Sequence, residues 1–162
     1  MGLSKQLSGE LKQESANTKK ILERVPEDKL SWKPHEKSMS MGRLAHHVAE
    51  LPIWIIRIFE ADDFDFVQMP KPVTPTSTKQ IMEEYEKTWA KAIQLLETTT
   101  DEYLETTWKL KRDGQTLWEA PRRVLIRNFI NHLIHHRGQL TVYLRLQDVP
   151  LPGLYGPTAD ER

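Results

Sequence analysis

The chain has 162 residues, enough for one domain that buries its own core. Its 23 Lys and Arg residues balance its 23 Asp and Glu residues, so the zero formal charge gives no basic surface that would favour nucleic acid or an anionic membrane as a partner. The chain contains no cysteine, which excludes disulfides, thiolate metal ligands and cysteine nucleophiles.

The amino-terminal segment is polar and lacks the apolar core of a signal peptide. No apolar run approaches the roughly 20 residues of a membrane span, so we expect a cytoplasmic protein with no membrane partner. Apolar residues at helical spacing predict a first helix over residues 3–24, ended by Pro26. Residues 29–39 contain Trp32, Pro34 and His35 and are predicted to be irregular, with His35 on the surface.

A second helix is predicted from a cap at Ser38 or Ser40 to about Glu60. At 100° per residue, His47 points along an apolar stripe whose other members lie within about 80° of it: Leu44, Leu51, Trp54, Ile55 and Ile58. His46 points about 100° away. Pro52 removes one backbone hydrogen bond and should bend this helix just after the histidines.

The second half of the chain predicts two more helices. Residues 62–76 are rich in proline and predict a long crossing loop, followed by a third helix over residues 78–97. Residues 98–119 are the least regular segment and favour a short β-hairpin around Asp113-Gly114. Pro121 suits the first turn of a fourth helix that runs to about Gln147, before a tail rich in proline.

These elements predict the fold class and the domain organisation. Four helices of about 20 to 27 residues with one long connection indicate an all-α protein, an antiparallel four-helix bundle with a short β-hairpin before the last helix. Residues 1–162 form a single domain in this interpretation.

Histidines at helical spacing form the candidate site. His132 and His136 are four residues apart and therefore share one helix face, and His47 can supply a third imidazole from a facing helix. Three protein ligands leave one coordination position of a divalent metal open, as in catalytic sites. His46 and His135 are rotated by about 100° from their neighbours and are not expected to coordinate. The alternative is that the histidines are hydrogen-bonded core residues.

Three further residues lie one or two turns from these histidines. Glu50 and Gln139 are candidates for outer-shell groups that orient an imidazole or a bound water, and Tyr143 either lines the pocket or packs in the core. For Glu50 the competing interpretation is a solvated charge on the helix surface. Imidazole ligands suit several first-row metals, so zinc and nickel are both candidates.

Two motifs carry a resemblance to a known family. The run from Ser40 to Glu50 (SMGRLAHHVAE), the run from His132 to Leu140 (HLIHHRGQL) and the tail with Leu154-Tyr155-Gly156-Pro157 resemble the DinB-like (DinB/YfiT) family of metal-dependent four-helix-bundle enzymes. The resemblance implies that His47, His132 and His136 occupy the family's metal-ligand positions. It also implies a thiol-dependent transferase or isomerase as one kind of activity, with a low-molecular-weight thiol as cosubstrate.

Three functional hypotheses follow. The first is a metal-dependent S-transferase or hydrolase that acts on a small molecule, whose reacting group is a metal-bound water or thiolate. The second is a bundle whose metal only joins two helices. The third is a metal-free interaction or dimerisation module, which leaves a homodimer open.

Overall fold

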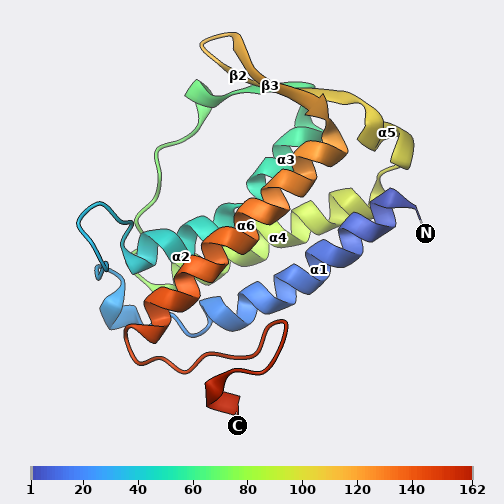
Figure 1. Cartoon of the computed structure of the whole chain (residues 1–162). Helices are drawn as coiled ribbons and strands as arrows, with labels where there is room; N and C mark the ends of the chain where they lie inside the picture. The colour runs from blue at the N-terminus through green and yellow to red at the C-terminus, as the bar shows by residue number, and fades with distance from the viewer. Residues whose placement is uncertain (1, 162) are drawn as a thin grey trace.

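The computed structural model describes residues 2–161, which are mostly helical and carry a small sheet at one end (Figure 1). Three long helices are α1 (Leu3–Leu22), α4 (Thr78–Thr98) and α6 (Arg122–Arg145). Their ends lie within two residues of the predicted first, third and fourth helices. The shorter elements are α2 (Met41–Glu50), α3 (Ile53–Glu60), α5 (Asp101–Glu105), β1 (Asp63–Asp65), β2 (Thr107–Arg112), β3 (Gln115–Pro121) and the 3-10 turns Glu27–Lys29, Phe66–Gln68 and Ala159–Glu161.

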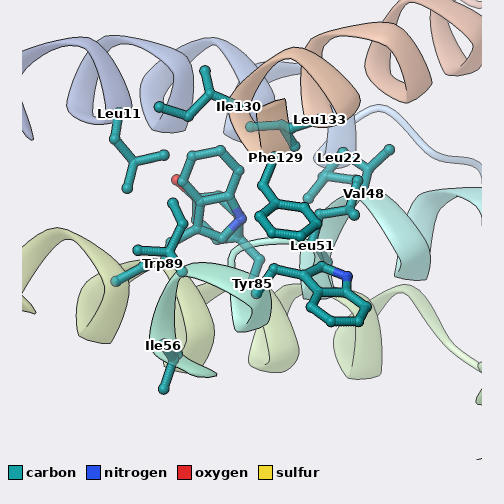
Figure 2. Close-up of a cluster of buried hydrophobic side chains, with 14 of the residues drawn as sticks. Leu11, Leu22, Val48, Leu51, Ile56, Tyr85, Trp89, Phe129, Ile130 and Leu133 are labelled. Atoms are coloured by element: carbon teal, nitrogen blue, oxygen red, sulfur yellow. The ribbon is translucent and has the colours of Figure 1, made fainter. Parts of the chain in front are cut away.

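One apolar core lies between the long helices. Helix α1 packs against α4 and α6, and α2 packs against the same two helices, so that side chains from all four meet (Figure 2). Trp89 of α4 lies at the centre with 1% of its surface exposed, among side chains contributed by the neighbouring helices, including Leu11, Leu51, Ile130 and Leu133. Burial of large apolar side chains of this kind is the main stabilising term of the fold.

The predicted second helix is two helices. It ends at Glu50 and resumes at Ile53, because Pro52 has no N–H to donate to the preceding turn. The carbonyl of Pro52 then accepts the N–H groups of Ile55 and Ile56 at 3.0 and 3.2 Å, which starts α3. The irregularity at Pro52 was expected as a bend in one helix, and the structure shows a break between two helices.

The prediction of an all-α fold is wrong in one respect, because the protein contains a three-stranded sheet in the order β1-β2-β3. The hairpin of β2 and β3 turns at Asp113 and Gly114, as predicted, with φ of 50° and 74°. The unexpected strand β1 runs parallel to β2 and lies where the crossing loop was predicted. It is held by contacts distant in sequence, with Asp65 accepting the N–H groups of Asp113 and Gly114 at 3.2 and 2.8 Å.

Two glycines should respond in opposite ways to alanine. Gly114 has a positive φ of 74°, which strains any residue with a Cβ, so Gly114→Ala should lower the free energy of unfolding by about 1 kcal/mol. Gly9 lies within α1, and a Cβ there meets no atom within 4 Å, so Gly9→Ala should raise the free energy of unfolding by about 0.5–1 kcal/mol. Urea unfolding of both variants measures the two changes. Equal effects at the two positions would contradict the backbone argument.

Candidate metal centre

Helix α6 sets the direction of two histidines through its apolar row. Leu125, Phe129, Leu133 and Leu140 are buried, and they fix the rotation of α6 against the core. His132 and His136 lie beside this row and are half-buried, at the boundary between core and solvent.

Helix α2 brings the third histidine to the same place. Ser40 caps the helix, since its hydroxyl oxygen accepts the Arg43 N–H at 3.2 Å. Leu44 and Val48 are fully buried, which turns the flank of α2 that carries His47 toward α6. His47 is half-buried like its partners on α6, with 20% of its side chain accessible.

The three imidazoles converge. One ring nitrogen from each of His47, His132 and His136 lies within 4.8 Å of the other two. The ring of His47 lies 5.6 Å from that of His132 and 4.8 Å from that of His136, centroid to centroid. Within residues 2–161, this is the group of His, Asp and Glu side chains whose spacing fits a metal ion. Their role as ligands stays a prediction.

The donor atoms that face the centre can be named. The Nδ1 of His136 lies 2.7 Å from the Gln139 side-chain oxygen and donates to it, so that Nε2 carries the lone pair. The Nδ1 of His47 lies 3.0 Å from a Glu50 oxygen and is fixed in the same way. The Nε2 atoms of His136 and His132 are 2.8 Å apart. Two nitrogens at that distance need a proton or a cation between their lone pairs.

His132 and His136 are held in the neutral form. The pKa of His132 falls from 6.5 to about 4, chiefly because burial penalises the charged ring, and further because His136, His47 and His135 are close by. Burial also lowers the pKa of His136, although its hydrogen bond to Gln139 opposes the shift. A neutral imidazole is the form that binds a metal, so the donor set fits a divalent cation.

Glu50 is a partly buried residue that contacts several basic side chains, and not a solvated surface charge. One of its oxygens lies 2.8 Å from an Arg43 guanidinium nitrogen and 3.0 Å from His47 Nδ1, and the other lies 3.1 Å from His46 Nδ1. Burial alone would raise the pKa of Glu50, but the interactions with His46, His47 and Arg43 outweigh it and hold this pKa far below its usual value.

The two neighbouring histidines have other partners. His46 is 6% exposed and is oriented toward Glu50. His135 is exposed, and its Nε2 accepts the Gln139 amide at 3.0 Å, so one glutamine holds both His135 and His136. Neither His46 nor His135 belongs to the converging group.

Tyr143 both packs against a neighbouring side chain and lines a cavity, the two alternatives that the sequence left open. Its ring packs edge-on against Trp32, with centroids 5.7 Å apart, and its hydroxyl donates to the Met39 carbonyl at 3.2 Å. It also lines the cavity next to His136. His35 is exposed, as expected, and its Nδ1 accepts the Lys37 N–H at 3.2 Å.

Comparison with known proteins decides the family. The sequence model of the DinB family matches residues 1–161, which includes both histidine motifs. The chain belongs to the DinB family. This DinB protein is 33% identical over 153 residues to the Bacillus subtilis (strain 168) protein named "Uncharacterized protein YrdA", an alignment that covers 91% of this chain and 85% of YrdA.

Solved structures share the fold of this DinB protein. A DinB-like protein from Bacillus cereus ATCC 10987 superposes with a TM-score of 0.72 at 27% identity, covering 92% of this chain and 95% of its own. The DinB-like protein YjoA from Bacillus subtilis gives the same TM-score at 22% identity, covering 97% of this chain and 99% of its own. At this identity the likeness shows the fold alone. Of the helices in the described part of the chain, none has both the length and the apolar character that a bilayer crossing requires.

A cavity of about 450 Å³ opens beside the histidines of this DinB protein. Residues before α2 form one wall and α6 forms the other; the lining is Lys37, Ser38, Met39, His136, Gln139, Val142 and Tyr143. The volume suits a small molecule. His136 is the triad member that reaches this cavity, so a molecule bound there would approach the centre from that side.

A larger hollow of about 800 Å³ lies beside the sheet. Its charged residues pair with one another: Lys111 lies 2.6 Å from Asp63, and Arg122, which is fully buried, lies 2.6 Å from Asp62. The lining of this hollow includes none of the three histidines. The smaller cavity is therefore the one relevant to the candidate centre.

One residue of the centre was missed from the sequence, namely Arg43. The signal was present, because Arg43, His47 and Glu50 are spaced i, i+4 and i+7 and therefore share one helix face.

Proposed function

We propose that this DinB protein is a metal-dependent enzyme acting on a small molecule, built on an antiparallel four-helix bundle. His47, His132 and His136 would hold the divalent metal. The observation that carries the proposal is the convergence of these three half-buried imidazoles within 4.8 Å, two of them with Nδ1 already bonded elsewhere. Such Nδ1 bonds are typical of metal-ligating histidines. Zinc and nickel both suit three imidazoles.

The bound cation would supply a Lewis acid that lowers the pKa of a water or thiol in the open position. The protein's own residues orient that centre. Glu50 accepts from His47 Nδ1, and Gln139 accepts from His136 Nδ1, so both rings present Nε2 inward. The cavity beside His136 would hold the substrate between α6 and the segment before α2.

The reaction class that we favour is a thiol-dependent S-transfer, with hydrolysis as the other candidate. The chain has no cysteine, so a thiolate nucleophile must come from a cosubstrate. The resemblance carried by the two histidine motifs implies the same choice.

The proposal is tested by metal analysis and then by an activity screen. The protein, purified without an affinity tag, should bind close to one equivalent of Zn²⁺ or Ni²⁺ in calorimetric titration. The metal-loaded form should then conjugate small thiols to an electrophile such as monobromobimane faster than the metal-free form. Activity that persists after complete metal removal would rule out a metalloenzyme. Metal binding without any turnover would support a non-catalytic bundle with a structural metal.

Metal should stabilise the fold without being required for it. A ligand that binds only the native state raises the free energy of unfolding by about 2.7 kcal/mol when its free concentration is one hundred times its dissociation constant. The core around Trp89 consists of buried apolar side chains, and the three candidate ligands are only half-buried beside it, so the metal-free protein should remain helical and melt at a lower temperature. Circular dichroism melts with and without a chelator measure the difference. An unfolded metal-free form would make the metal structural.

A further inference from the structure

The spacing of Glu50 makes it a potential metal ligand. It follows His47 by three residues on α2, and a glutamate and a histidine three residues apart on one helix both reach the ion in carboxylate-rich helix bundles. Here the converging group contains the three histidines and not Glu50. Something in the fold therefore turns this carboxylate away from the centre.

Both oxygens of Glu50 lie near basic side chains on the side away from the centre. The first oxygen has two partners, a guanidinium nitrogen of Arg43 at 2.8 Å and His47 Nδ1 at 3.0 Å. The second lies 3.1 Å from His46 Nδ1. All the partners come from α2, so the arrangement is set by one helix.

We infer that Arg43 is a positioning residue that holds the Glu50 carboxylate against His47 Nδ1 and so prevents it from becoming a fourth protein ligand. This inference rests on the proposed metal site. By keeping Glu50 outside the coordination sphere, Arg43 would preserve the open position on the side of the cavity.

The physical reason is the burial of the pair. The side chains of Arg43 and Glu50 are 16% and 24% exposed, so solvent screens their attraction only partly. Arg43 supplies a permanent positive charge and donates in a fixed planar geometry. Without it, Glu50 would be a partly buried carboxylate with too little positive charge nearby, and a divalent ion would be the strongest available partner.

The test uses Co²⁺-loaded protein with azide as the probe for the open position. In Arg43→Met, Glu50 should enter the coordination sphere, so the visible absorption bands of Co²⁺ should shift before azide is added. Azide affinity should fall by about tenfold or more, while Co²⁺ affinity is retained or rises. In Arg43→Met/Glu50→Gln, azide affinity should return to the value of Glu50→Gln alone.

The matched control is Arg127→Met. Arg127 lies on α6, the helix that carries His132 and His136, and pairs with Glu10 of α1, so its replacement breaks an arginine–glutamate pair and should leave both readouts unchanged. If circular dichroism shows that Arg43→Met does not fold, Arg43→Gln carries the same test. Unchanged spectrum and azide affinity would overturn the inference. A loss of azide affinity that the added Glu50→Gln substitution does not restore would also overturn it, since Arg43 would then bind the anion itself. A drop in Co²⁺ affinity would overturn it as well, because that result indicates a merely structural role.

Co²⁺ titration of the wild type beside His47→Ala, His132→Ala and His136→Ala separates this inference from the proposed function. If Co²⁺ binding does not depend on the three histidines, the proposed site fails first. If it does depend on them and Arg43→Met behaves as wild type, only the positioning role fails.

Discussion

His136→Ala is expected to abolish stoichiometric metal binding. His136 lies close to both other imidazoles. Its Nε2 is 2.8 Å from the Nε2 of His132, and its ring centroid is 4.8 Å from that of His47. Two remaining imidazoles hold a divalent ion poorly, so affinity should drop by more than about 100-fold, beyond the usual effect of an outer-shell change. His47→Ala and His132→Ala should do the same. Titration calorimetry with Zn²⁺ measures all three.

The neighbouring histidines provide the matched controls. His135→Ala removes an exposed ring that contacts Gln139, and His46→Ala removes a ring that faces Glu50. Both variants should keep one metal per chain, because neither ring belongs to the converging group. Loss of metal in His46→Ala comparable to that in His47→Ala would reverse the ligand assignment on α2.

Arg137→Met is expected to lower the free energy of unfolding by about 3–5 kcal/mol, because it leaves a buried carboxylate without its counter-charge. Arg137 is 1% exposed and pairs at 2.6 Å with Glu14 of α1, whose side chain is 5% exposed. Its other nitrogen donates to the Thr18 hydroxyl at 3.1 Å, and the Tyr155 hydroxyl donates to Glu14 at 2.7 Å. The cluster thus joins α1, α6 and the carboxyl-terminal tail. Urea unfolding of the metal-free protein measures the loss.

A double variant distinguishes the pair from its surroundings. In Arg137→Met/Glu14→Leu no charge is left buried, so most of the lost stability should return. Arg127→Met breaks the pair with Glu10, whose side chains are 41% and 33% exposed, and should cost far less because solvent screens that pair. If Arg137→Met and Arg127→Met cost the same, the burial argument is wrong.

Local features of the sequence determined several elements by themselves. The apolar rows around Trp89 and Leu133 specify α4 and α6 because a helix repeats every 3.6 residues, and this period can be read from neighbouring residues. Pro52 breaks the second helix and Asp113-Gly114 turns the hairpin for equally local reasons, a missing N–H and a positive φ. The shared face of His132 and His136 follows from the same helical period.

Contacts between distant residues were decided by the tertiary structure. Strand β1 has three residues and exists because it pairs with β2, more than forty positions later, which no local pattern encodes. The pairing of Arg137 with Glu14 spans 123 residues, and it appears only when α1 packs on α6. His47 was expected to face the other two histidines, but its distance from them depends on how α2 docks on α6. The sequence alone determined most of the residues that face inward on each helix, with the exception that His46 is more buried than His47. The packing of the helices decided which of these residues meet, because that depends on side-chain volumes summed over the whole core.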